Sequence, residues 1–104
     1  MGTEMILEVA IMSVKLDKTA EFEAVFPKAA ALSRSTPGCI SVEMQRCVET
    51  KGKYFYMLRW ETLEAHTVTW ANSPQRAEFR KLIADFWADP PFTQHFQAVT
   101  NDRI

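Results

Sequence analysis

The sequence predicts a single α+β domain with the element order β-α-β-β-α-β. Segments rich in β-branched and aromatic residues alternate with segments whose apolar residues recur at helical spacing. Clusters of Pro, Gly and Asp mark the changes between them. A chain of 104 residues has room for one such domain, over residues 1–104. This order is ferredoxin-like, with a four-stranded antiparallel sheet, and here the second helix is split in two.

The first strand and the first helix occupy the opening third of the chain. Residues 6–14 (ILEVAIMSV) are almost all β-formers and predict the strand. Either Asp17 or Thr19 is expected to cap the helix that follows. The buried stripe of this helix comprises Phe22, Val25, Phe26, Ala29 and Leu32. Thr36-Pro37-Gly38 then ends the helix and turns the chain.

A hairpin is predicted next, with strands over 39–48 and 54–60 joined by a loop that contains Gly52. Thr62 is a candidate N-cap for a short helix that runs to about Ala71. Ser73-Pro74 places a capping residue before a first-turn proline, which is a start signal for another helix.

The last helix and the last strand complete the order. The helix has a buried stripe at helical spacing, made of Phe79, Leu82, Ile83 and Phe86. Asp89-Pro90-Pro91 is expected to stop it, because proline cannot continue a helix. Residues 92–100 are then expected to form the fourth strand.

Charge and composition exclude several classes of partner. Twelve basic and thirteen acidic side chains give a net charge of −1, so no basic patch for nucleic acid or an anionic membrane is expected. No apolar run is long enough to span a bilayer, and the N-terminus lacks the pattern of a secretory signal. We expect a cytoplasmic location.

Cys39 and Cys47 lie too far apart on one extended strand to form a disulfide, and the spacing of His66 and His95 does not suggest a metal site.

The predicted sheet has two apolar faces. Residues 54–60 read YFYMLRW, whereas a strand with one wet face should alternate between apolar and polar residues. Two helices cover only one face of a four-stranded sheet, so a second copy of the chain is expected to cover the other. Arg59 would face this dimer side, with Glu8 or Glu43 as its carboxylate partner.

The residues around Trp60 carry a family resemblance. Trp60-Glu61-Thr62-Leu63-Glu64-Ala65-His66, followed by Asn72-Ser73-Pro74, resembles the antibiotic biosynthesis monooxygenase family, as do Pro37-Gly38-Cys39, Pro90-Pro91 and His95-Phe96. The resemblance implies a homodimeric α+β barrel. It also implies that some relatives oxygenate phenols or quinols with O₂, using neither metal nor flavin, whereas others degrade haem or isomerise small metabolites.

Two departures from the family pattern narrow the expected chemistry. Members often carry a second histidine three residues after the first, where this chain has Thr69. Haem-degrading relatives use an asparagine and an axial histidine at positions near Ala10 and Arg80 of this chain. Neither of these residues ligates iron, so we expect no haem and no other cofactor or metal.

The candidate site residues are aromatic or basic. Trp60 and His66 are the candidate catalytic residues, since an indole can stack on an aromatic ring and a neutral imidazole can remove a phenolic proton. His66 shares a helical stripe with Leu63 and Trp70, and packing alone also explains it. The candidate substrate-binding residues are Tyr54, Tyr56, Trp70 and Arg80. His95 is expected at a dimer contact or on the rim.

These residues favour a cofactor-independent monooxygenase that acts with O₂ on an aromatic, phenolic or quinol-type small molecule. Two alternatives remain open from the sequence. One is a non-catalytic dimeric barrel that binds a small hydrophobic ligand. The other is an isomerase or lyase on the same scaffold that uses His66 for proton transfer without oxygen.

Overall fold

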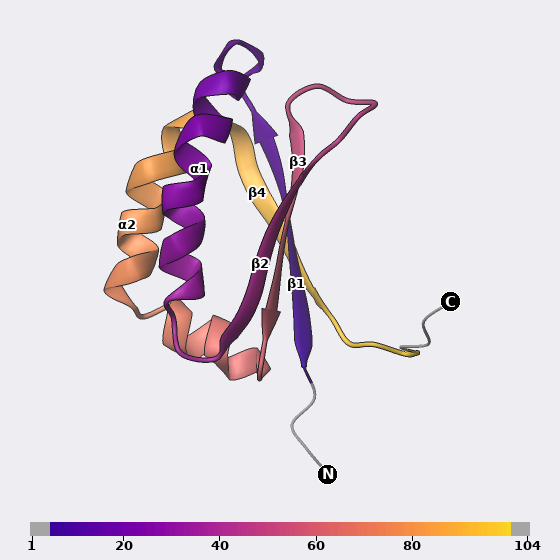
Figure 1. The fold of residues 1–104 in the computed structure, drawn as a ribbon, viewed down its shortest axis with the longest axis vertical. Coiled ribbons are helices and arrows are strands. Elements are labelled where there is room, and N and C mark those ends of the chain that lie inside the picture. The colour runs from indigo at the N-terminus through magenta and orange to yellow at the C-terminus, as the bar shows by residue number, and fades with distance from the viewer. Residues whose placement is uncertain (1–4, 101–104) are drawn as a thin grey trace.

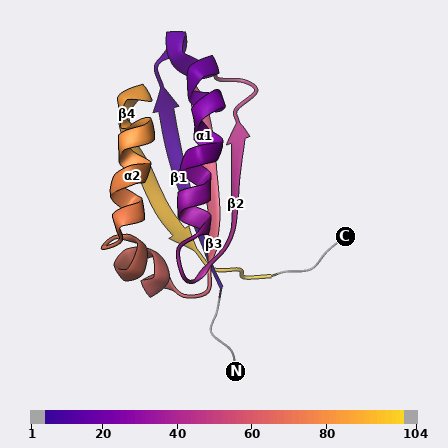
Figure 2. The same cartoon turned by 60° about the vertical axis from the view of Figure 1, so that its left-hand side comes forward.

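The computed structural model describes residues 5–100, which form a sheet with helices on one face (Figure 1). Figure 2 shows α1 and α2 side by side in front of the sheet. In chain order the elements are β1 (Ile6–Val14), the 3₁₀ turn η1 (Leu16–Lys18), α1 (Thr19–Arg34), β2 (Cys39–Arg46), β3 (Lys53–Trp60), the π-helix η2 (Ala65–Trp70), α2 (Pro74–Ile83), the 3₁₀ turn η3 (Ala84–Phe86) and β4 (Trp87–Phe96).

The sheet is antiparallel, with the order β2-β3-β1-β4. This order confirms the ferredoxin-like α+β fold with a split second helix. The register places Val9 opposite Met57 of β3 on one side and opposite Gln94 of β4 on the other. β1 and β3 are the central strands, so their side chains have neighbours on both sides.

The start of α1 differs from the sequence prediction. The N-cap residue is Lys18, which makes no capping hydrogen bond through its side chain. Asp17 lies within η1, which leads directly into α1, and Thr19 is already the first residue of the helix. Neither predicted residue therefore caps α1. Its buried face includes Phe22, Phe26, Ala29 and Ser33.

Both predicted start signals of the split helix are confirmed. The Thr62 hydroxyl accepts a hydrogen bond of 3.1 Å from the Ala65 amide, and the Ser73 hydroxyl accepts one of 3.2 Å from Arg76. The first segment is a π-helix, in which the Ala71 amide donates to the His66 carbonyl at 3.2 Å. π-helical turns are rare in proteins, and many of those that occur lie at functional sites.

The end of α2 also differs from the prediction. α2 ends at Ile83, and Pro90 and Pro91 lie within β4 rather than stopping a helix. β4 is an edge strand, where proline is tolerated because a missing amide costs no ladder hydrogen bond on the open side. The register between β1 and β4 shifts on either side of Ser13, opposite this segment.

Gly38 fixes the approach of η2 to the end of β3. Its φ of +89° is a left-handed conformation, and an added Cβ would lie 2.6 Å from Cβ of Ala65, in the first turn of η2. The Gly38 carbonyl accepts a 2.8 Å hydrogen bond from Glu61, just after β3. A larger side chain here would displace the helix that carries His66.

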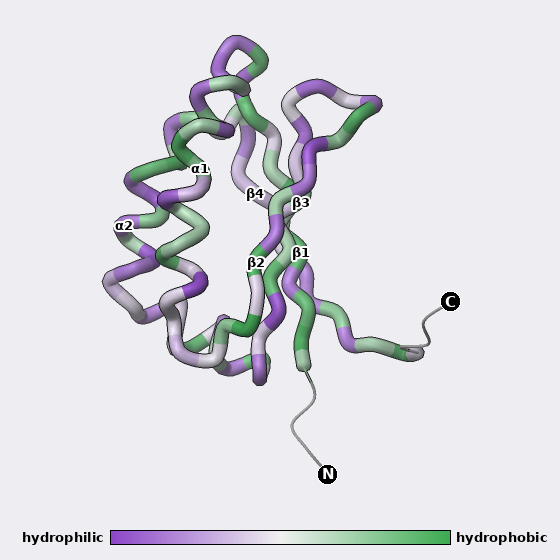
Figure 3. Tube along the Cα trace, viewed as in Figure 1, coloured by the Kyte–Doolittle hydropathy of each residue, from purple (hydrophilic) through white to green (hydrophobic). Residues whose placement is uncertain are grey.

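The two faces of the sheet differ in burial. The helix-covered face holds the core, where Trp60, Tyr54 and Phe22 are almost wholly buried. Apolar residues recur along the strands as well as along the helices (Figure 3). On the opposite face Phe55 is 38% exposed and Phe92 is 57% exposed. This second face carries a group of apolar side chains, and no helix of the described chain covers it.

None of the helices within residues 5–100 combines the length and the apolar character needed to cross a membrane.

Candidate active site

Glu8 is a buried carboxylate in the middle of an apolar strand. In β1 the side chains of Ile6, Glu8 and Ala10 point to the helix-covered face, and Glu8 is 6% exposed. Arg59 lies on an exposed position of β3 and pairs with Leu7, not Glu8, in the register. The Glu8 alternative for the partner of Arg59 is therefore wrong, because the two residues lie on opposite faces of the sheet. Glu43, the other predicted partner, lies on the same face as Arg59, and its carboxylate accepts a hydrogen bond from Gln45.

Trp60 is the hydrogen-bond donor to Glu8. Its indole Nε1 donates to Glu8 Oε1 at 2.9 Å, and the side chain is fully buried at the end of β3. A buried carboxylate needs such donors, since an unpaired charge in an apolar environment is costly. The hydrogen bond from the indole thus holds the Glu8 carboxylate in position.

His66 lies between two partners. Its Nε2 is 3.4 Å from Glu8 Oε2, and its Nδ1 is 2.7 Å from Nε2 of His95. The imidazole also lies over Trp60, with ring centroids 5.4 Å apart. The wide π-helical turn presents His66 to this cluster, whereas Leu63, which was predicted to share its buried stripe, is 40% exposed.

His95 enters the site from the edge strand. It pairs directly with Glu8 in the β1–β4 register, so the two side chains share one face of the sheet. His95 is exposed, whereas Glu8 is buried. The three side chains therefore form a line from the surface inwards: His95, His66, Glu8.

The protonation states follow from burial. Burial raises the pKa of Glu8 to about 7, and the hydrogen bond from Trp60 opposes this rise only in part. Burial, with smaller contributions from His95 and Arg76, lowers the pKa of His66 to about 4. Burial also lowers the pKa of His95. At neutral pH His66 is uncharged, and Glu8 is close to the midpoint of its titration.

A cavity of about 350 Å³ opens beside this line, between the sheet and the helices. It is lined from the sheet side by Glu8, Ala10, Met12, Tyr56, Leu58, Trp87, Pro91 and Thr93, and from the helix side by Ser33, His66, Thr67, Trp70, Ala71, Arg76, Phe79 and Arg80. Its walls are mostly apolar and aromatic, as in sites that bind small molecules.

Comparison with known proteins identifies the family. The sequence profile named antibiotic biosynthesis monooxygenase matches residues 5–82 of this chain. The chain belongs to the antibiotic biosynthesis monooxygenase family.

Members and relatives of this monooxygenase family resemble the chain over most of its length. YczJ of Bacillus subtilis, an uncharacterized protein, is 34% identical over 95 residues, which cover 91% of this chain and 100% of YczJ. A crystal structure of a Bordetella bronchiseptica protein assigned to antibiotic biosynthesis monooxygenases has a TM-score of 0.89 and 34% identity, covering 93% of this chain and 99% of that one. The structure of the Streptomyces coelicolor monooxygenase ActVA-Orf6, solved with nanaomycin D, has a TM-score of 0.81 and 16% identity. The match covers 98% of this chain and 94% of that one.

Three polar atoms of the cavity-lining residues are buried without a hydrogen bond within residues 5–100. They are the Ser33 hydroxyl, the Tyr56 hydroxyl and the Trp87 indole Nε1. Burial raises the pKa of Tyr56; Ser33 is near enough to oppose this rise, although the two hydroxyls lack hydrogen-bond geometry. Buried polar groups are normally paired, so all three are candidates for contact with a ligand.

Two arginines add positive charge to the cavity. Arg76 and Arg80 both line it from α2, and the Arg80 guanidinium lies 5.3 Å from the ring centroid of Trp87. Stacking on an aromatic ring orients a guanidinium without neutralising it. The cavity thus combines a carboxylate–histidine end with positive charge from α2.

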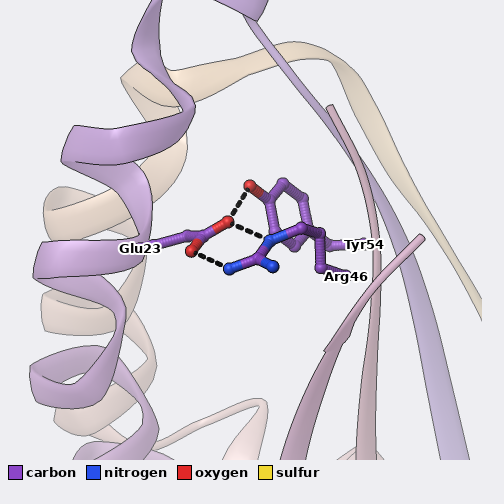
Figure 4. Close-up of polar contacts among 3 residues, drawn as sticks. All are labelled: Glu23, Arg46 and Tyr54. Atoms are coloured by element: carbon purple, nitrogen blue, oxygen red, sulfur yellow. Dashed lines mark hydrogen bonds and ion pairs between the residues drawn. The ribbon is translucent and has the colours of Figure 1, made fainter. Parts of the chain in front are cut away.

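The structure brings together most of the predicted site residues. Tyr56, His66, Trp70 and Arg80 line the cavity among the residues described, whereas Trp60 lies behind its wall, in contact with Glu8 and His66. Tyr54 lies elsewhere. Its hydroxyl donates a 2.6 Å hydrogen bond to Glu23, which also forms an ion pair with Arg46 at 2.6 Å (Figure 4).

The contacts of Tyr54 hold α1 against the sheet edge. Hydrogen bonds from Arg46 and Tyr54 lower the pKa of Glu23 to about 2, and burial together with Glu23 raises the pKa of Tyr54 to about 12. Tyr54 and Glu23 line a second groove of about 650 Å³ between α1 and β2, which shares Tyr56 with the first cavity. We assign Tyr54 to this structural contact.

Glu8 and His95 are the site residues that sequence reasoning missed. A lone acidic residue at an inward position of the apolar strand 6–14 was the signal for Glu8. The signal for His95 depends on the pairing of two strands about eighty residues apart, which alternation alone does not supply.

Proposed function

We propose that this chain is a cofactor-independent monooxygenase that oxidises a phenolic or quinol-type aromatic compound with O₂. The observation that carries the proposal is the Glu8–His66 pair, which lies 3.4 Å apart in the wall of an aromatic cavity. Membership of the antibiotic biosynthesis monooxygenase family supports the reaction class. The ligand reported for ActVA-Orf6, nanaomycin D, supports an aromatic substrate.

The cavity fits a flat substrate with oxygen at both ends. Phe79 and Trp70 supply aromatic walls, and they contact each other edge to face with centroids 5.5 Å apart. We place the reacting phenol at Glu8 and His66. A second oxygen of the substrate, as a carbonyl, hydroxyl or carboxylate, would then accept hydrogen bonds from Tyr56 and Trp87 and attract Arg80. The volume of about 350 Å³ suits two or three fused rings.

The reaction begins with loss of the phenolic proton to the Glu8–His66 pair. The resulting phenolate is electron-rich and transfers one electron to O₂, which gives a phenoxyl radical and superoxide. These combine at the para ring carbon, which carries a hydrogen, to form a C–O bond. That carbon gives up its proton to the outer oxygen as the O–O bond breaks, which leaves a quinone carbonyl and hydroxide, and the hydroxide takes up the phenolic proton to form water. One phenol and one O₂ give one quinone and one water.

Oxygen consumption tests this function directly. Purified protein is mixed with a panel of phenols, naphthols and anthrones whose para carbon carries hydrogen, and O₂ uptake and quinone absorbance are followed against protein-free controls. We expect equal amounts of O₂ consumed and quinone formed. Turnover without O₂ would favour an isomerase or lyase, and saturable binding without turnover would favour a ligand-binding barrel.

We further propose that two copies pair through the uncovered face of the sheet. The face carries Phe55, Met57, Phe92 and Phe96 beside Leu7, Val9 and Ile11 of β1. An apolar patch of this kind on a small domain is typical of an interaction surface. Pairing would remove it from water while leaving the cavity, which lies under the helices, intact.

A further inference from the structure

We propose that Glu8, His66 and His95 form a proton relay that connects the cavity with the solvent. This inference rests on the proposed monooxygenase function and extends it by giving Glu8 and His95 roles of their own. Glu8 is the group that exchanges protons with the substrate. His66 is the intermediate carrier, and His95 is the exit to water.

The first argument is that both ring nitrogens of His66 are engaged. Nδ1 is 2.7 Å from His95 and Nε2 is 3.4 Å from Glu8. A histidine with two such partners has no lone pair left for a substrate hydroxyl. Glu8 lines the cavity and retains acceptor capacity on its two oxygens, so the substrate proton goes to Glu8 and not to His66.

The second argument is that solvent exposure increases along the line from Glu8 to His95. The Glu8 side chain is 8% exposed and that of His66 is 17% exposed, whereas His95 is an exposed residue of the edge strand. A substrate that fills the cavity would cover the Glu8 carboxyl group on its open side and separate it from solvent. The imidazoles of His66 and His95 supply the path.

The third argument is that the line has two hydrogen-bonded states that differ by one proton. In the inward state His95 Nε2–H donates to His66 Nδ1, and His66 Nε2–H donates to the Glu8 carboxylate. In the outward state the Glu8 carboxyl group donates to His66 Nε2, and His66 Nδ1–H donates to His95 Nε2. A proton entering at His95 Nδ1 converts the first state into the second, and release there reverses the change.

The two states complete the proposed reaction. Release of a proton at His95 converts the outward state into the inward state, in which the Glu8 carboxylate takes the phenolic proton. After O–O cleavage Glu8 delivers this proton to the departing hydroxide, and a proton that enters at His95 restores the outward state. One proton leaves and one returns at His95, and the phenolic proton ends in the one water formed from phenol and O₂. The relay ends each cycle in the arrangement in which it began.

The charges around the line agree with these states. The pKa of about 7 for Glu8 lets it bind and release a proton near neutrality, and the pKa of about 4 for His66 disfavours a lasting imidazolium. The neighbouring titratable groups are Tyr56 of β3, Cys39 of β2 and Arg76 of α2. Arg76 is cationic and the other two are neutral, because burial raises the pKa of both.

The relay is tested first without substrate. Nitrogen-15 NMR of histidine-labelled protein reports which ring nitrogen of His66 and His95 carries the proton. We expect the tautomers of both histidines to change together with an apparent pKa near 7 in the wild-type protein. In Glu8→Gln they should be independent of pH over that range. Histidines that titrate separately, or unchanged behaviour in Glu8→Gln, would overturn the relay.

A second experiment tests the relay during turnover. We expect His95→Gln to lower kcat by about tenfold with an unchanged KM, to enlarge the solvent deuterium isotope effect, and to recover when imidazole is added to the buffer. Gln97→Ala, a nearby exposed change, is the control and should behave as wild type. Full kcat in folded His95→Gln would overturn the relay even where oxidation is confirmed. If no substrate is oxidised, the proposed function fails, and the NMR result alone decides the relay.

Discussion

Glu8 and His95 lie directly opposite each other on the neighbouring strands β1 and β4, and the imidazole of His66 contacts both. One of the two facing residues is buried and the other is exposed. The sheet thus places a carboxyl group with a raised pKa one imidazole away from the surface. The following predictions depend on this arrangement and on the cavity beside it.

Single substitutions should separate two opposing pH dependences of stability. The folded-state pKa of Glu8 is raised from 4.5 to about 7, so its contribution is complete below pH 4.5 and is lost as the pH rises through 7. The pKa of His66 is lowered from 6.5 to about 4, so its contribution is present above pH 6.5 and is lost as the pH falls through 4. Between these limits the two slopes oppose each other.

We therefore expect the free energy of unfolding of the Glu8→Gln variant to rise as the pH increases from 4 to 6.5. That of the His66→Gln variant should fall as the pH increases from 4.5 to 7. Each change should be no more than about 3.5 kcal/mol, since one pKa unit corresponds to about 1.4 kcal/mol. Urea denaturation across this range measures it. Below pH 4 all variants should lose stability alike, because the lowered pKa of Glu23 is common to them. Parallel curves for the two variants would contradict the assigned pKa shifts.

Two tyrosines on the same strand should respond differently to loss of the hydroxyl group. Tyr56→Phe removes a buried hydroxyl without a hydrogen bond in the described chain, so stability should hold while KM rises by about threefold to tenfold, the usual effect of one lost hydrogen bond. Tyr54→Phe removes the hydrogen bond to Glu23 outside the cavity, so KM should hold and stability should fall by about 1 kcal/mol or less. Thermal melts and steady-state kinetics distinguish them. The reverse pattern would place the substrate in the groove beside α1.

Charge on the uncovered sheet face should disrupt pairing. Met57 pairs with Val9 in the middle of this face, so Met57→Glu would bury an unpaired carboxylate in a dimer interface and is expected to give a monomer. Light scattering across micromolar concentrations measures the mass. Val48→Glu, in a loop position that is 89% exposed, is the matched control and should leave the dimer unchanged. A wild-type monomer, or a dimeric Met57→Glu protein, would refute pairing through this face.

Local signals predicted much of this molecule. β1 extends over the predicted residues 6–14, and Thr62 and Ser73 cap the segments that they were expected to cap. These features depend on neighbours in the sequence. The predictions that were wrong concern features that depend on tertiary context instead. Pro90 and Pro91 are accommodated because β4 is an edge strand, which no local pattern states.

The candidate site likewise contains residues that local signals predicted and residues whose roles depend on the tertiary structure. Family likeness and residue type led to His66, Tyr56, Trp70 and Arg80, all of which line one cavity. The role of Glu8 depends on which face of the sheet the helices cover, and that of His95 depends on the long-range register of β1 and β4. The π-helical turn that presents His66 also alters the helical stripe expected with Leu63. None of these three facts follows from spacing within one segment.

The central claim is that the Glu8–His66 pair takes a proton from a phenol that O₂ then oxidises. The measurement that tests it most directly is O₂ consumption, with quinone formation, by wild type and by His66→Gln on the same anthrone. His66→Gln keeps approximately the size and hydrogen-bonding capacity of the side chain but removes the basic nitrogen. We predict stoichiometric oxidation by wild type and a kcat lower by about a hundredfold to ten-thousandfold in the folded variant. Undiminished oxidation by folded His66→Gln would contradict the account.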